Sequence, residues 1–197
     1  MASSFVDIAN SALIRMGASI ISDLGDNTTE ANACRVRIFP CRDFVLRMHP
    51  WNCATTRVIL APDLSPPAFG YAYQFTLPSD CLKALDVSDD PGGSDVVNGS
   101  RPDYKIEGRK ILFQSNKLYF RYIQRVDDPS ILEEGCVEAI SAYLAYDLSQ
   151  YLLQNEVTTA NLYNQFKQTM AQARNLASQE EDISSVIDRF ERVRRGW

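Results

Sequence analysis

Histidine is almost absent from this chain of 197 residues, which contains one, and the usual motifs of catalytic chemistry are missing as well. There is no G-x-x-x-x-G-K-[ST] phosphate-binding loop and no G-x-S-x-G nucleophile motif. No second ligand or nucleophile is spaced to work with His49. We therefore expect His49 to end a helix with its ring beside Trp51, and we expect no catalytic residue, cofactor or metal site.

Paired cysteines and long apolar runs are lacking too. The five cysteines are odd in number and none forms a C-x-x-C pair, so we expect neither a disulfide framework nor a structural zinc site. They are expected to act as small core residues in a reducing cytosol. No run approaches the roughly 18 apolar residues of a membrane helix, and the first residues lack the pattern of a secretory leader.

Positive charge is in short supply. Twenty Lys and Arg face 25 Asp and Glu, which gives a net charge of −5 and a pI near 4.9. A general nucleic-acid binder has the opposite balance. The apolar fraction of 45% is sufficient for a sizeable core, and the length suits one domain or a domain with an insertion.

The first quarter of the sequence is predicted to be helical. Apolar residues repeat at intervals of three and four over residues 5–16, and Gly17 follows where a C-terminal glycine belongs. Asn27 with Glu30 resembles the capping box of a second helix. Pro40 lies inside the pattern of that helix, so we expect a kink or a break near residues 36–40.

The last third returns to a helical pattern. Asp128 and Pro129 place a cap residue before a proline at the first helical position, and Asn155 or Thr158 is expected to start a fourth helix. The predicted buried residues are Cys136, Ile140, Tyr143, Leu144, Leu148 and Tyr151 in the third helix and Leu162, Phe166, Thr169, Ala173 and Leu176 in the fourth.

The middle of the chain is predicted to form strands. Residues 53–60 are rich in β-branched side chains, residues 82–87 form a short strand candidate, and Tyr71, Tyr73 and Phe75 alternate with small or polar residues. Two successive hairpins are expected, with turns at Gly108-Arg109 and at Ser115-Asn116.

The order of these elements predicts a mainly α fold with a β insertion, of the α+β class. Residues 1–50 and 127–182 are expected to form an antiparallel helical bundle. Residues 51–126 are expected to form a small β domain inserted between the second and third helices. Residues 183–197 are expected to form an extended or helical C-terminal tail.

The tail, ISSVIDRFERVRRGW, differs in character from the rest of the chain. Its apolar residues fall on one helical stripe, and its four arginines exceed its two acids by two charges. An amphipathic segment of this kind either folds back on its own bundle or lies in the groove of a partner. Because Trp and Arg dominate protein interfaces, the RRGW ending favours the partner.

Adjacent carboxylates suggest one alternative function. A glycoside hydrolase needs two acids facing each other across a cleft, one of them with a raised pKa. Acids that neighbour each other in turns and first helical turns are more typical of caps. The candidates are Asp89-Asp90, Asp127-Asp128, Glu133-Glu134 and Glu180-Glu181-Asp182.

Three segments in order carry a resemblance to a known family. RDFVLRMHPWNCA, FGYAYQFTLPSDCLK and KIEGRKIL resemble the tail tubular protein A family of short-tailed bacteriophages, the head-to-tail adaptors or gatekeepers, and the likeness spans nearly the whole chain. The family usually has Phe after PWN, where this chain has Cys53.

This resemblance implies a structural role in the virion tail, after assembly in the host cytoplasm. Adaptors of the family form a ring, commonly of twelve copies, between the portal protein and the tail nozzle protein. DNA passes through the lumen without specific binding, which suits an acidic wall that repels phosphates. No membrane is involved. A tail-associated polysaccharide hydrolase is the main alternative, and a DNA-binding terminase accessory is a weaker one.

Two docking surfaces follow from the resemblance together with the residue patterns. The tail is expected to reach the portal, and the stiff aromatic stretch from Pro66 to Val87 is expected to dock on the nozzle or on a neighbouring copy. The candidate portal-docking residues are Ile183, Val186, Ile187, Phe190, Arg192, Val193, Arg194, Arg195 and Trp197. The candidate nozzle-docking or neighbour-docking residues are Pro66, Pro67, Phe69, Tyr71 and Tyr73.

Overall fold

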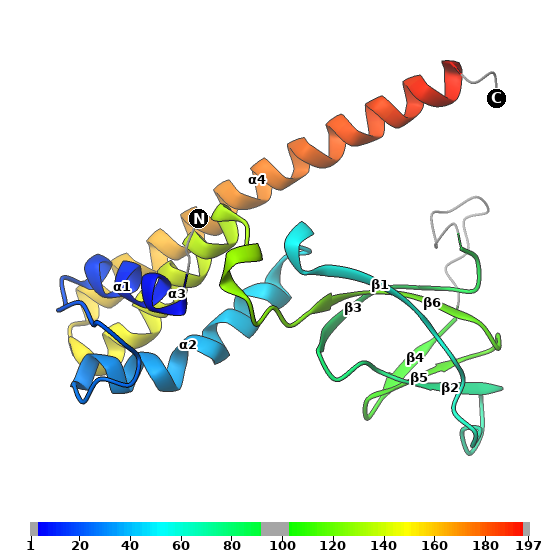
Figure 1. Ribbon diagram of the computed structural model, residues 1–197, viewed down its shortest axis with the longest axis horizontal. Helices are drawn as coiled ribbons and strands as arrows, with labels where there is room; N and C mark the ends of the chain where they lie inside the picture. Colours follow the sequence, from blue (N-terminus) through cyan, green and yellow to red (C-terminus); the bar gives the residue numbers. More distant parts are fainter. Residues whose placement is uncertain (1–3, 92–102, 195–197) are drawn as a thin grey trace. The chain divides into compact units, whose positions relative to one another are not determined.

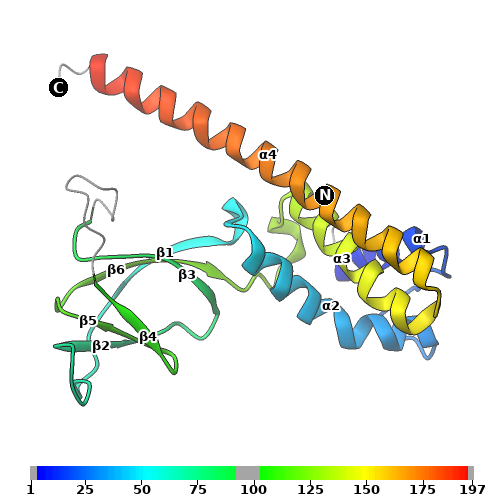
Figure 2. The same cartoon turned by 180° about the vertical axis from the view of Figure 1, so that it is seen from behind.

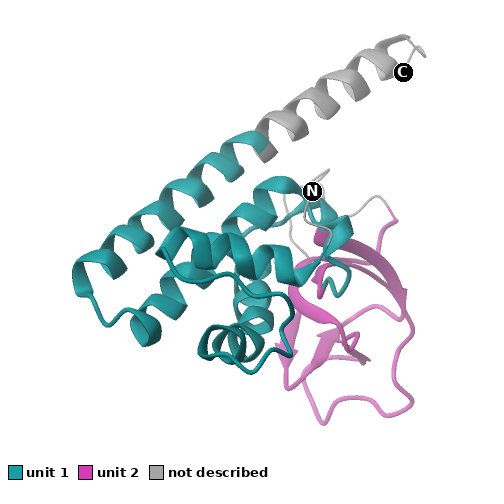
Figure 3. Cartoon of the chain, turned by 60° about the vertical axis from the view of Figure 1, so that its left-hand side comes forward, with its two compact units in different colours: residues 1–53, 126–197 teal, residues 54–125 magenta. Residues whose placement is uncertain are grey.

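The computed structural model describes residues 4–91 and 103–194, with side chains described as far as residue 176. Over these residues the fold is mixed α and β, with four α-helices and two small antiparallel sheets (Figure 1). The chain divides into two compact units (Figure 3). Unit 1 comprises residues 1–53 and 126–197, and unit 2 comprises residues 54–125.

Helix α1 (Phe5–Met16) begins and ends where its sequence predicts. Ser4 and Asp7 form a capping box, in which each side chain accepts a hydrogen bond from the other residue's backbone N–H. Gly17 ends the helix with a left-handed φ of 72°, a conformation that glycine adopts without steric cost. The following loop is held by Asn10, whose amide pairs with both the N–H and the C=O of Ile21.

Helix α2 (Thr29–Met48) corrects two sequence expectations. Thr28, and not Asn27, is the N-cap, because its side chain accepts from the backbone N–H of Ala31. The helix is unbroken through Pro40, so of the predicted kink or break the break does not form. Seven buried side chains hold the helix on both sides of the proline: Ala31, Cys34, Ile38, Cys41, Arg42, Val45 and Leu46.

Helix α3 (Glu134–Leu152) is the centre of unit 1. It contacts α1, α2 and α4 (Glu156–Arg194), and it lies alongside α4 in both views (Figure 1, Figure 2). Asp128 and Pro129 begin a short 3-10 turn, η2 (Pro129–Ile131), and not the helix itself. The buried residues of α3 are Cys136, Val137, Ala139, Ile140, Ser141, Ala142, Leu144, Ala145, Leu148 and Ser149.

Helix α4 starts after Asn155, whose side chain accepts from the backbone N–H groups of Val157 and Thr158. Its described buried side chains are Leu162, Phe166, Met170 and Ala173. Leu176 was predicted on this stripe but is 62% exposed, so that prediction is wrong. Tyr151, predicted to be buried in α3, is also mostly exposed.

Unit 2 holds two three-stranded antiparallel sheets, ordered β1-β6-β3 and β2-β5-β4. A short 3-10 turn, η1 (Asn52–Ala54), precedes β1. The strands are β1 (Thr55–Leu60), β2 (Tyr73–Thr76), β3 (Cys81–Ser88), β4 (Lys105–Glu107), β5 (Lys110–Phe113) and β6 (Leu118–Gln124). Their core consists of Phe75, Val87, Ile111, Phe113, Leu118, Phe120 and Tyr122.

One of the two predicted hairpins is correct. Strands β4 and β5 pair across Gly108 and Arg109, which both have positive φ as a tight hairpin turn requires. The hairpin predicted at Ser115-Asn116 does not form, because β5 pairs in one sheet and β6 in the other. The chain crosses between the sheets at that point, and Phe113 and Leu118 bury their side chains in the shared core.

Candidate functional site

The segment between β1 and β2, residues 61–72, carries four of the five predicted nozzle-docking residues. Pro66 and Phe69 are exposed, whereas Pro67 and Tyr71 are half-buried. Tyr73, the fifth, is the first residue of β2 and is 36% exposed. The segment that carries the first four of these residues, residues 61–72 of unit 2, is called the docking loop below, and Tyr73 follows it directly.

Asp63 fixes the start of the docking loop against the β2–β5–β4 sheet. Its carboxylate accepts a hydrogen bond from Thr76 Oγ1 at 2.9 Å and lies 2.5 Å from Nζ of Lys110. Its backbone N–H donates to the C=O of Gln74 at 2.8 Å. The hydrogen bond from the Lys110 ammonium lowers the pKa of Asp63 below its ordinary value. The hydrogen bond from Thr76 lowers it further, by a smaller amount.

Further hydrogen bonds hold the rest of the docking loop. Gln74 Nε2 donates to the C=O of Ser65 at 2.8 Å, and Gln114 Nε2 donates to the C=O of Gly70 at 3.1 Å. Gly70 has a φ of 87°, which a residue with a side chain rarely adopts. The hydroxyl of Tyr71 donates to Asp103 Oδ1 at 3.1 Å. The loop is therefore held near both of its ends, at Asp63 and Ser65 and at Gly70 and Tyr71.

This fixed loop presents two large apolar side chains to solvent. Leu64 is fully exposed and Phe69 is 87% exposed. A folded protein gains nothing in its own stability from such exposure, and exposed apolar groups on an ordered loop are typical of an interaction site. Sequence reasoning missed Leu64, although an isolated Leu inside the turn-forming run PDLSPP is the pattern that marks it.

The predicted portal-docking residues lie outside the described side chains. Their backbone as far as Arg194 belongs to α4, which continues without interruption from the part that packs on α3 (Figure 1). The tail was expected to be either extended or helical, and its backbone is helical over residues 183–194. The residues concerned are Ile183, Val186, Ile187, Phe190, Arg192, Val193, Arg194, Arg195 and Trp197.

Unit 1 has an open groove of about 620 Å³ between α2 and α3. Val36 and Tyr151, both 65% exposed, line it together with the ion pair of Arg37 and Asp147. This pair is bidentate, with Nε to Oδ2 at 2.6 Å and Nη2 to Oδ1 at 2.7 Å. The groove thus combines apolar side chains with a fixed pair of charges.

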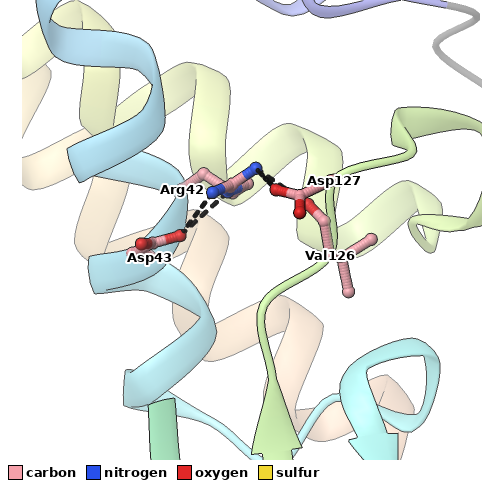
Figure 4. Close-up of polar contacts among 4 residues, drawn as sticks. All are labelled: Arg42, Asp43, Val126 and Asp127. Carbon is pink, nitrogen blue, oxygen red and sulfur yellow. Dashed lines mark hydrogen bonds and ion pairs between the residues drawn. The ribbon is translucent and has the colours of Figure 1, made fainter. Parts of the chain in front are cut away.

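Arg42 of α2 organises the segment at which the chain returns to unit 1 (Figure 4). Its side chain is buried, and Nη1 donates to the C=O of Val126 at 3.0 Å and to Asp127 Oδ1 at 2.9 Å. Nε donates to Asp43 Oδ1 at 2.9 Å. The guanidinium also lies over the ring of Phe39, with Cζ 5.2 Å from the ring centre.

Three of the carboxylates considered for a hydrolase, Asp127, Asp128 and Glu133, have structural roles. Asp127 pairs with Arg42, and Asp128 caps η2 by accepting from the N–H of Ser130. Glu133 accepts from the backbone N–H of Cys53 at 2.7 Å. The side chains of Glu180, Glu181 and Asp182 lie outside the described residues.

His49 ends α2, as the sequence predicts. Its ring meets that of Trp51 edge to face, with ring centres 4.9 Å apart. Over residues 4–91 and 103–176, no group of three or more His, Cys, Asp or Glu side chains could hold a metal ion. No helix in the described part of the chain is long and apolar enough to cross a membrane.

Comparison with known proteins adds no family assignment. No protein family model matches this chain, and no curated protein matches it.

Proposed function

We propose that the chain is a structural head-to-tail adaptor of a bacteriophage virion, which forms a ring between the portal protein and the tail nozzle protein. The observation that carries this proposal is the docking loop, which is fixed by hydrogen bonds and exposes Leu64 and Phe69. A preorganised loop loses little conformational entropy on binding. This arrangement suits a protein whose work is to bind other proteins.

In the proposed adaptor the helices act as one antiparallel bundle, and the β unit is an insertion between α2 and α3. Apolar side chains exposed on the helices, among them Val36 and Tyr151 beside the α2–α3 groove, supply contacts for neighbouring copies in the ring. A ring needs two different complementary patches on each copy. Twelve copies is the number that the family resemblance implies.

The lumen of the proposed ring conducts DNA without binding it. A net charge of −5 on each copy, repeated around the ring, makes the assembly strongly acidic. Such a wall repels phosphates, whereas a basic lining would hold the DNA in a salt-dependent way. The portal contact is assigned to the tail, residues 183–197.

Electron microscopy of the purified chain mixed with a portal protein tests the proposal. We expect rings on the portal with the full chain and none after deletion of residues 183–197. The deletion leaves the described buried residues of α4, which end at Ala173, in place, so circular dichroism should show a folded protein. Portal rings formed equally well without the tail would contradict its assignment.

A second experiment separates the adaptor from the hydrolase. Nozzle binding should be lost in the double variant Leu64→Ser/Phe69→Ser and retained in Ile59→Ser, an exposed apolar residue outside the docking loop. Turnover of host polysaccharide that disappears on substitution of a single Asp or Glu would instead establish the hydrolase.

A further inference from the structure

Cys53 and Cys136 come from distant parts of the sequence and meet in unit 1. Cys53 lies in η1, the short turn after α2, and Cys136 lies in the first turn of α3. Their thiols form a hydrogen-bonded pair. None of the five cysteines is in a disulfide, so both groups are free thiols.

The surrounding contacts hold this pair in place. The backbone N–H of Cys53 donates to Glu133 Oε1 at 2.7 Å, and Glu133 is the N-cap residue of α3. Trp51 is buried, and its ring packs against the same turn of α3 at Gly135. The packing is close enough that a Cβ added to Gly135 would lie 3.8 Å from Cζ3 of Trp51. The segment containing residues 51–53 is thus anchored on the residues that flank Cys136.

The two thiols differ in accessibility and in acidity. Cys53 is half-buried, whereas Cys136 is completely buried. The hydrogen bond from the Cys136 thiol lowers the pKa of Cys53, and a hydrogen bond from the backbone of Glu133 acts in the same direction. The same contact between the thiols raises the pKa of Cys136, and burial raises it further. Cys53 is the more accessible of the two thiols and is therefore the one that meets an oxidant first, whereas Cys136, buried and in contact with it, is placed to resolve the product.

We propose that Cys53 and Cys136 form an oxidisable dithiol that closes into an intramolecular disulfide when the protein meets a peroxide. In the first step the Cys53 thiolate attacks one oxygen of hydrogen peroxide. This forms an S–O bond, breaks the O–O bond and releases hydroxide. In the second step the sulfur of Cys136 attacks Cys53, the S–O bond breaks, and the departing hydroxyl takes the Cys136 proton to leave as water.

The overall step is balanced by the peroxide. The two thiols are oxidised by two electrons and lose two hydrogen atoms, and one hydrogen peroxide is reduced to two waters. Thiols in a thiol pool reverse the reaction by exchange. A small oxidant suits this site because the resolving sulfur is buried.

The other cysteines serve as internal controls. Cys34 and Cys41 are both buried in α2, and burial raises their pKa values to about 11 and about 12. Buried thiols of this kind are not expected to be the first to react with a peroxide at neutral pH. Cys81 is half-buried at the start of β3, in unit 2.

The disulfide would enclose all of unit 2, because residues 53 and 136 flank residues 54–125 on both sides. Closing so long a loop restricts the unfolded chain, and we expect the melting temperature to rise by about 5–10 °C. The proposal is independent of the adaptor function, since it depends only on contacts within unit 1.

The test treats the full chain with a small molar excess of hydrogen peroxide and maps disulfides by mass spectrometry of non-reduced peptides. We expect a peptide pair linking Cys53 to Cys136 that is two hydrogens lighter than the reduced pair, with the melting temperature raised. In Cys136→Ser the sulfenic acid on Cys53 should persist and react with dimedone. In the control Cys81→Ser the 53–136 link should form normally.

Three results would overturn the proposal. These are oxidation of Cys53 to the sulfinic acid without a link in the unaltered chain, a link that joins either cysteine to another residue or chain, and no reaction at Cys53 at all. Because the mapping uses the unaltered chain, it decides the question even if a cysteine variant fails to fold.

Discussion

The carboxylate of Asp63 lies 2.5 Å from Nζ of Lys110 and thereby ties the docking loop to β5. We expect Asp63→Asn to lower the free energy of unfolding by roughly 1 kcal/mol, since the pair is partly exposed. Amide exchange over residues 61–72 should become faster. Asp89→Asn, a change at an exposed aspartate of the same unit, is the matched control and should alter neither quantity.

The same carboxylate predicts a pH dependence. The pKa of Asp63 is lowered in the folded protein by Lys110 and then by Thr76, so at acidic pH the unfolded chain binds more protons than the folded one. Stability from this group is complete above its unfolded pKa, near pH 4, and is lost as the pH falls further. Amide exchange in residues 61–72, measured between pH 6 and pH 3, should show this loss of stability. The pH dependence should disappear in Asp63→Asn.

Leu64 and Phe69 are predicted to serve binding and not stability. Because both side chains are exposed, the double change to Ser should alter the free energy of unfolding by less than about 0.5 kcal/mol. Urea denaturation measures this directly. A loss above about 2 kcal/mol would mean that the two side chains pack inside the protein, and the docking loop would lose its assignment.

Arg42 is predicted to be essential to the stability of unit 1. Arg42→Ala leaves the C=O of Val126 without its buried donor, breaks two ion pairs and removes the cation over Phe39, at a cost of about 2–3 kcal/mol. Arg35→Ala is the matched control. Arg35 is exposed on the same helix and bonds Asn32, so its loss should cost less than about 0.5 kcal/mol in the same urea titration.

Pro40 is predicted to destabilise the helix that contains it. Proline lacks the N–H that would bond the C=O of Val36 and its ring crowds that carbonyl, so Pro40→Ala should raise the free energy of unfolding by about 1–3 kcal/mol. A fall in the urea midpoint would show that the ring contributes packing that alanine cannot replace.

Alkaline pH should destabilise unit 1 through Cys34 and Cys41. Burial raises the pKa of these thiols to about 11 and about 12, so between pH 9 and those values the folded chain binds more protons than the unfolded one. Stability is complete below pH 9 and falls as the pH rises. Urea midpoints at pH 8 and pH 10 should differ, and the difference should shrink in Cys34→Ala/Cys41→Ala.

Local patterns in the sequence predict the elements of this fold well. The spacing of apolar residues from Phe5 to Met16 predicts both ends of α1 correctly. The pair Gly108-Arg109 predicts the turn between β4 and β5. Both features depend on side chains within a few residues of each other. Of the kink or break expected near residues 36–40, the break does not form, because tertiary burial of Ile38 and Cys41 outweighs the local preference of proline.

Pairings between distant residues were beyond sequence reasoning. The Ser115-Asn116 turn has the composition of a hairpin, yet the choice of partner for β6 depends on β1 and β3. In the docking loop, the aromatic and proline residues were visible in the sequence. Lys110, which holds the loop through Asp63, lies 47 residues away and could not be found from spacing.

The pairing of β1 with β6 has a consequence for how the protein is made. Thr55 of β1 lies opposite Ile123 of β6, and β6 is the strand with which β1 pairs in its sheet. The first strand of unit 2 can therefore pair only after the last strand has been made. During synthesis on the ribosome, β1 therefore emerges early and remains an unpaired edge until nearly the whole unit has been translated. Residues 54–125 should consequently collapse late and in one concerted event.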